Sequence, residues 1–172
     1  MQSNGASTRD LEESRRLIRQ RLVDEKAVDP DALERMEVMF DLNRLSTRLS
    51  RDFESIHRAH GLTWAGFRII DMLWAVGDLA PSRLADLTGS SRASISSVLK
   101  SLEASGLITR NTDTSNRRVV QVSLTNKGKK MLAESIPIQA RREQAWLAVL
   151  TTAELATLKK IVHRLMSQAP PD

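Results

Sequence analysis

Apolar side chains recur every three or four residues along most of the chain, the spacing that puts them on one face of an α-helix. This pattern predicts helices over residues 9–25, 30–60, 63–76, 81–88, 91–105, 125–150 and 151–168. Val120, Val122 and Leu124 instead alternate with polar residues, as in a half-buried strand, and residues 107–111 predict a partner strand. The chain is therefore expected to be mainly α-helical with one small β-hairpin.

Residues that begin and end helices support several of these boundaries. Asp29 followed by Pro30 is typical of a helix start. Thr151 and Glu154 have the spacing of a capping box, which predicts the start of the last helix. Pro137 lies inside the predicted helix 125–150 and is expected to kink or interrupt it.

The order helix, short helix, turn, helix and hairpin over residues 62–124 is the pattern of a winged helix-turn-helix. In the helix predicted over residues 91–105, the apolar residues from Ile95 to Leu102 share one face and are expected to be buried. The opposite face is small and hydroxylated, with cations on it and at its N-terminus. The candidate recognition-helix residues are Ser91, Arg92, Ala93, Ser94, Ser96, Ser97 and Lys100.

A helix face of this kind suits the major groove of double-stranded DNA. Small side chains let the backbone approach base edges, where hydroxyls form hydrogen bonds and arginine binds guanine. The alternative interpretation is an ordinary solvent-exposed face. Serine is a mediocre helix former, however, so four serines within eight residues favour a functional reason.

The polar loop of the predicted hairpin is the second candidate DNA contact. Its candidate residues are Asp113, Asn116, Arg117 and Arg118. A hairpin tip with paired arginines reaches a minor groove, whose negative potential attracts them. Asp113 is placed to pair with Arg118 and order the loop, although an exposed pair contributes little to stability.

The distribution of charge agrees with a nucleic-acid partner. The 172 residues carry a net charge of +5, and residues 82–130 hold nine basic against three acidic groups. One segment thus carries more than the whole excess, which is the expected footprint of a phosphate binder. A basic face without a partner remains the alternative.

Composition also excludes several classes of protein. The chain has no cysteine, which excludes disulfides, thiolate zinc sites and thiol redox sensing. No apolar run approaches the roughly 18 residues of a membrane span, and the charged first 25 residues do not resemble a secretory signal, so a cytoplasmic protein is expected. The sequence contains no recognisable catalytic motif, and it predicts no enzyme, no cofactor and no metal site.

The chain resembles the MarR family of bacterial transcriptional regulators. The resemblance covers about residues 33–166, and its most specific part is the wing followed by a Leu-Thr-x-Lys-Gly entry to a helix. The matching segments are Leu84–Gly89, Ser91–Ser96, Leu102–Ile108, the Asp113 to Arg118 loop and Leu124–Gly128. Where the family usually has a second Asp before the paired arginines, this chain has Asn116.

The resemblance implies a homodimer on a pseudopalindromic operator. Residues 31–61 and 125–168 would form the helical dimerisation domain, residues 62–124 the DNA-binding domain, and residues 1–30 an extension with a short amphipathic helix that adds packing. It also implies that Arg117 enters the minor groove and that Arg118 pairs with Asp113. Because the redox-sensing branch needs a cysteine, a diffusible ligand is the expected signal.

Many family members bind small aromatic or anionic ligands beside the DNA-binding lobe. The residues expected near that position are Arg48, Phe53, His57, His60, Trp64, Phe67 and Arg68. An aromatic wall with Arg or His suits a carboxylate, and the alternative is that these rings belong to the core.

The leading hypothesis is a dimeric repressor that a small ligand releases from its operator. A sequence-tolerant architectural DNA-binding protein is the alternative, and a protein-interaction adaptor that has lost DNA binding is a third. The basic segment 82–130 argues against the adaptor.

Overall fold

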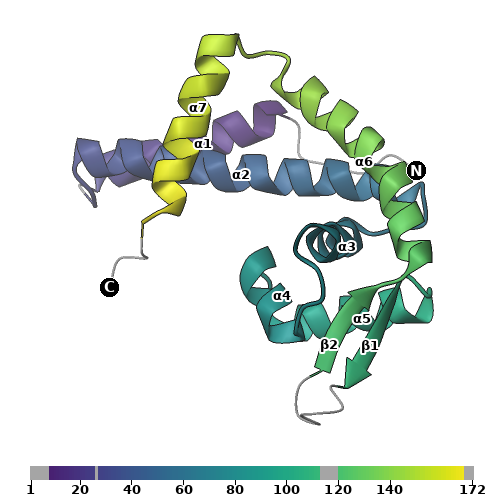
Figure 1. Ribbon diagram of the computed structural model, residues 1–172. Helices are drawn as coiled ribbons and strands as arrows, with labels where there is room; N and C mark the ends of the chain where they lie inside the picture. The colour runs from purple at the N-terminus through teal and green to yellow at the C-terminus, as the bar shows by residue number, and fades with distance from the viewer. Residues whose placement is uncertain (1–7, 26, 113–119, 169–172) are drawn as a thin grey trace. The chain divides into compact units, whose positions relative to one another are not determined.

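The computed structural model describes residues 8–25, 27–112 and 120–168 (Figure 1). The described residues are mainly α-helical, and two strands pair as one antiparallel β-hairpin. This confirms the predicted fold class. The elements are α1 (Thr8–Asp24), α2 (Pro30–Arg58), α3 (Trp64–Val76), α4 (Pro81–Thr88), α5 (Arg92–Ala104), β1 (Ile108–Thr112), β2 (Val120–Leu124), α6 (Asn126–Leu147) and α7 (Thr152–Met166).

Contacts divide the chain into two compact units, with the boundary inside α2 between Ser50 and Arg51. In the first unit, α1 packs on the first part of α2. Arg15 lies 2.9 Å from Asp41 and Arg19 lies 2.9 Å from Glu37, and both pairs join the two helices. Leu33 is buried there. Residues 1–30 therefore contribute a helix that is attached by charge pairs as well as apolar contact.

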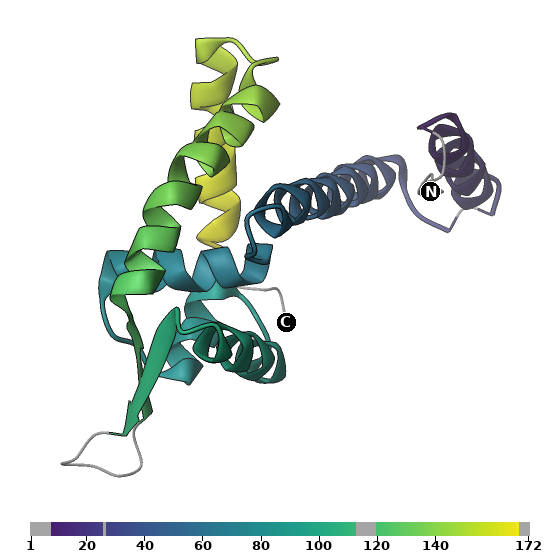
Figure 2. The same ribbon diagram turned by 90° about the vertical axis from the view of Figure 1, so that its right-hand side faces the viewer.

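The core of the second unit is formed by α3, α4, α5 and the hairpin. Its fully buried members include Ile70, Leu84, Leu99 and Val122. The hairpin pairs Ile108 with Leu124 at its base, and it lies next to α5 (Figure 2). Leu79, just before α4, exchanges two backbone hydrogen bonds with Val122 and so adds a short third segment to the sheet.

Side-chain caps begin four of the helices. Thr63, Ser91, Thr125 and Thr151 each accept a hydrogen bond from a backbone N–H in the first turn of the helix that follows. The predicted capping box at Thr151 is confirmed. These caps satisfy N–H groups that have no partner within the helix.

Two predicted helix ends and the predicted interruption at Pro137 need correction, and the helix predicted over residues 125–150 ends at Leu147. α2 ends at Arg58, two residues before the predicted end, because the amides of His60 and Gly61 bond three residues back in a tighter turn. Pro137 does not interrupt α6, which runs through it to Leu147. Proline removes one backbone hydrogen bond, but Leu132, Ser135 and Gln139 are buried on both sides of it, and this packing keeps the helix continuous.

The first turn of α6 is packed against the end of α5. The Thr125 hydroxyl accepts from the Gly128 N–H at 3.0 Å and lies 2.8 Å from the carbonyl oxygen of Gly106, to which it donates. Gly128 is buried, and a Cβ at this position would overlap the carbonyl oxygen of Leu107. The close approach therefore requires glycine at position 128.

We expect Gly128→Ala to lower the free energy of unfolding by about 1–3 kcal/mol, because the added methyl group meets backbone atoms that cannot rotate away. Urea denaturation followed by circular dichroism measures the change. Asn126→Ala, at an exposed position of the same turn, is the control and should change stability by less than about 0.5 kcal/mol. Equal stability of the two variants would contradict the steric argument.

Candidate nucleic-acid interface

Helix α5 separates its apolar and polar residues as the sequence predicted. Ile95, Leu99 and Leu102 are buried on the inner face. All seven candidate recognition-helix residues, Ser91, Arg92, Ala93, Ser94, Ser96, Ser97 and Lys100, are exposed to solvent. The helix therefore presents to solvent the face that sequence reasoning assigned to DNA.

The start of α5 is capped by Ser91, and the end of the helix is bound by a residue of α6. At its start, the Ser91 side chain accepts from the Ser94 N–H at 3.2 Å, and Arg68 of α3 donates to the Thr88 carbonyl just before it. At its end, the Lys127 ammonium donates to the Ser105 carbonyl at 2.8 Å.

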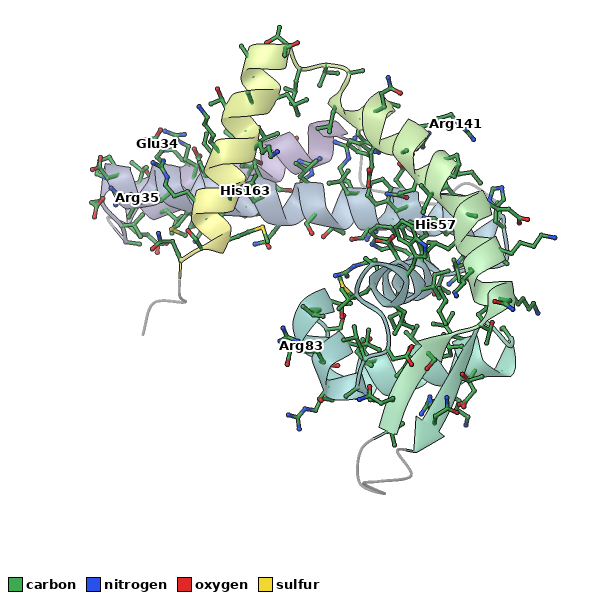
Figure 3. The ribbon with its side chains drawn as sticks, viewed as in Figure 1. Glu34, Arg35, His57, Arg83, Arg141 and His163 are labelled. Atoms are coloured by element: carbon green, nitrogen blue, oxygen red, sulfur yellow. The ribbon has the colours of Figure 1, made fainter. Side chains whose placement is uncertain are left out.

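The structure gives two basic residues of the 82–130 segment a role that sequence reasoning missed. Arg110 on β1 forms an ion pair of 3.1 Å with Glu103 on α5, and Lys127 binds the end of α5. Both belong to the basic segment whose charge, read from the sequence, predicts a phosphate-binding surface. The position of Lys127 between a capping threonine and an obligatory glycine was the available signal. Arg83, Arg92 and Lys100 are exposed, and Arg83 lies on the outer side of α4 (Figure 3).

The predicted wing residues fall outside the described part of the chain. Asp113, Asn116, Arg117 and Arg118 come between the paired strand ends Thr112 and Val120. Their roles at the minor groove stay predictions.

The predicted ligand residues fall into two groups. Phe53, His57, Trp64 and Phe67 come together in one cluster, with ring centroids 4.2 Å apart for His57 and Phe67 and 4.9 Å for Phe53 and Trp64. These rings pack on one another, as expected for core residues. The ligand role of this cluster is untested.

The other three predicted ligand residues are Arg48, which lies in the first compact unit, and Arg68 and His60, which have the partners that follow. Arg68 contacts Thr88, and the Nδ1 atom of the exposed His60 lies 2.8 Å from the Ile56 carbonyl oxygen of its own helix.

His57 is the polar centre of the ring cluster. Its side chain is 1% exposed, and its Nε2 lies 2.9 Å from the Gln139 side-chain oxygen on α6 (Figure 3). The Gln139 amide in turn donates to Glu143 at 2.8 Å, so its oxygen faces the histidine and His57 donates from Nε2. Burial lowers the pKa of His57 despite this hydrogen bond, which keeps the ring neutral near pH 7.

A second link joins α2 to α6. The Arg142 guanidinium binds both carboxylate oxygens of Asp52, and the Trp146 indole N–H donates to the same carboxylate at 2.7 Å. The hydrogen bonds from Arg142 hold the pKa of Asp52 below its usual range. Nothing in the local sequence around either residue indicates this pairing, which spans 90 positions.

We expect the pH dependence of stability to report on His57. Its folded pKa is lowered, so the unfolded chain takes up a proton near pH 6.5 that the folded chain resists. Stability should fall as the pH drops from 7 to 5, and His57→Phe should reduce this slope. Urea titrations at several pH values measure it. His163→Phe, which removes an exposed histidine, is the control; an unchanged slope in His57→Phe would contradict the assignment.

No described helix combines the length and the apolar character required to span a membrane. The described residues also contain no group of three His, Cys, Asp or Glu side chains arranged for a metal ion.

Comparison with known proteins identifies the family. A family model described as MarR family matches residues 62–120, which contain α3 to β1 and the start of β2. The uncharacterized HTH-type transcriptional regulator YwaE of Bacillus subtilis is 31% identical over 134 residues, covering 77% of this chain and 78% of that protein. Transcriptional repressor MprA of Escherichia coli is 35% identical over 91 residues, covering 52% and 51% of the two chains.

A solved structure of BpsR from Bordetella bronchiseptica matches with a TM-score of 0.71 at 23% identity, covering 77% of this chain and 94% of that one. At this identity the match supports the fold. DNA binding by BpsR is regulated by 6-hydroxynicotinic acid. With the helices and hairpin described above, the sequence matches show that this chain belongs to the MarR family of winged helix-turn-helix transcriptional regulators, which bind DNA and are not enzymes.

Proposed function

We propose that the protein is a homodimeric repressor that binds a pseudopalindromic operator and is released from it by a small aromatic or anionic ligand. The observation that carries the proposal is the exposed face of α5, where hydroxyl groups lie together with Arg92 and Lys100. Repression and ligand release are properties of relatives: MprA is a repressor, and 6-hydroxynicotinic acid regulates DNA binding by BpsR.

The face of α5 suits base recognition for steric and chemical reasons. Ala93 and the serines add little bulk, so the helix backbone can come close to base edges in the major groove. Arg92 stands in the first turn, the part of a recognition helix that enters the groove. We propose that the α5 residues make base contacts and that Asp113, Asn116, Arg117 and Arg118 form the wing contact.

Exposed apolar side chains on α7 and on α2 favour a dimer. Along the whole of α7 no residue is buried, although Leu155, Leu158, Val162 and Leu165 form one apolar stripe. In the first unit, Met39, Phe40, Leu42 and Leu45 are exposed on α2. Apolar surface of this extent marks an interaction site.

We therefore propose residues 31–61 and 125–168 as the dimerisation domain, residues 62–124 as the DNA-binding domain, and residues 1–30 as an extension of the former. A two-fold dimer would place its two α5 helices about one turn of DNA apart, roughly 34 Å.

We expect Arg92→Ala to weaken operator binding by about 1–3 kcal/mol, because a bidentate contact to a base is lost. Fluorescence anisotropy with a duplex that carries the palindrome beside its gene measures this affinity, and a scrambled duplex measures specificity. Lys159→Ala on α7 is the matched control for loss of one exposed cation. Equal affinity for both duplexes would favour the architectural alternative, and an unchanged Arg92→Ala affinity would exclude base reading by this residue.

We expect Leu158→Asp to turn the dimer into a monomer, because it places a charge in the centre of the apolar stripe of α7. Light scattering after size-exclusion chromatography should give the 19.2 kDa mass of one chain for this variant and twice that mass for the parent. Lys159→Asp, the next residue along, should remain dimeric. A parent protein that elutes as a monomer at micromolar concentration would refute the dimer.

A further inference from the structure

The turn between α4 and α5 receives a hydrogen bond from an arginine on α3. Arg68 is half-buried, and its guanidinium donates from Nη2 to the backbone carbonyl of Thr88, the last residue of α4. Among the described residues, no carboxylate forms an ion pair with Arg68. Its charge is therefore directed to the C-terminal end of α4, where the helix dipole attracts a cation.

The Thr88 carbonyl depends on this donor. Thr88 is buried, and Gly89 ends the helix directly after it in the left-handed region at φ 63°. The amides of Gly89 and Ser90 bond to carbonyl groups earlier in α4, and in the described part of the chain no backbone N–H is bonded to the Thr88 carbonyl. A buried carbonyl without a donor costs free energy, so Arg68 supplies the partner that the turn itself does not provide.

This turn leads directly into the start of α5. Gly89, Ser90 and Ser91 are the residues between Thr88 and the helix, and Ser91 is its N-cap. The bond from Arg68 is thus made four residues before Arg92, at the end of α5 that carries the proposed base contact.

Helix α3 also lies close to the other end of α5. Gly66 is buried, and a Cβ at this position would be 3.3 Å from the Leu102 side chain, near the end of α5. α3 contacts both α4 and α5 (Figure 1). One helix therefore meets α5 near its end and binds the turn that precedes its start. Losing the bond to Thr88 leaves the start of α5 without this polar attachment.

We propose that Arg68 is a positioning residue for DNA recognition. By holding the Thr88 carbonyl, it places the first turn of α5 and Arg92 where they can contact base edges, while its own side chain binds protein. This role differs from the ligand contact expected from the sequence. It rests on the proposed function, because it requires that α5 reads bases. A direct contact between Arg68 and a DNA phosphate is the competing explanation, and the test separates the two.

The test measures how Arg68→Met, which removes the donor but keeps a long side chain, binds the operator duplex and its scrambled form. Fluorescence anisotropy over a series of salt concentrations gives both affinities and their salt dependence. We expect operator affinity to fall about tenfold, because a charge-assisted hydrogen bond is lost before the recognition helix, and scrambled-duplex affinity to change by less than about twofold. The salt dependence should stay the same, since the phosphate contacts remain.

Two further variants of the same residue grade the effect. Arg68→Lys keeps a cationic donor and should recover most of the lost operator affinity. Arg68→Gln keeps a neutral donor and should fall between Arg68→Met and the parent. Circular dichroism shows whether each variant is folded, and Arg68→Gln takes the place of Arg68→Met in the same comparison if the latter does not fold.

Amide hydrogen exchange of the protein without DNA reports on the turn itself. In Arg68→Met, the amides of Gly89 and Ser90 should exchange faster relative to Val122 in the hairpin. Ile136→Val is the matched control, because it removes one methyl group from a half-buried side chain packed on the same core and lowers stability without changing the turn. It should keep the relative exchange rates of the parent and the parent's ratio of operator to scrambled affinity.

Three results would overturn the positioning role: an unchanged affinity ratio in Arg68→Met, unchanged exchange at Gly89 and Ser90, or an equal loss of the ratio in Ile136→Val. A parallel loss on both duplexes, with a salt slope shallower by about 0.9 for each Arg68, would assign this residue to a phosphate instead. A parent protein that does not distinguish the two duplexes refutes the proposed function and this role together. A parent that distinguishes them, beside an Arg68→Met variant that does so equally well, refutes the role of Arg68 alone.

Discussion

The close approach of α6 to the end of α5 is the constraint on which the proposed DNA-binding face of α5 depends. Gly128 permits it because a side chain would collide with the Leu107 carbonyl. Thr125 and Lys127 then bond to the carbonyl groups of Gly106 and Ser105. Thr125, Lys127 and Gly128 thus join the start of α6 to the end of α5, the proposed recognition helix. The Leu-Thr-x-Lys-Gly motif has a physical reason: each of its last three specified positions contacts the junction between α5 and β1.

The C-terminal half of α6 is bound to α2 by side-chain hydrogen bonds and an ion pair. His57 bonds to Gln139 inside the ring cluster, and Asp52 binds Arg142 and Trp146. α6 therefore connects the last turns of α2 to the end of α5 within one compact unit. Because α6 runs unbroken through Pro137, both sets of contacts belong to one continuous helix.

Local features of the sequence predicted most of the fold. Caps such as Thr63 and Thr151 and the apolar spacing of α5 depend on residues within one or two helical turns, so helix positions and buried faces followed from them. Contacts between distant residues did not. The pair of Asp52 and Arg142, and the roles of Lys127 and Arg110, depend on how helices are arranged in space. The same limit affected the expected ligand residues: Phe53, His57, Trp64 and Phe67 meet in one cluster, and sequence spacing did not distinguish them from Arg68, whose hydrogen-bond partner is Thr88.

Lys127 and Arg110 already have partners within the protein, the Ser105 carbonyl and Glu103. This changes how many basic groups of the segment 82–130 can be assigned to phosphate binding. DNA binding releases counterions in proportion to the phosphates that a protein neutralises, about 0.9 per contact in duplex DNA. Two of the nine basic groups between residues 82 and 130 already hold a helix end and a glutamate. If the segment binds DNA as proposed, the number of ions released is expected to be smaller than the charge of the segment suggests. Part of the basic charge between residues 82 and 130 thus positions α5, the helix proposed to contact DNA bases.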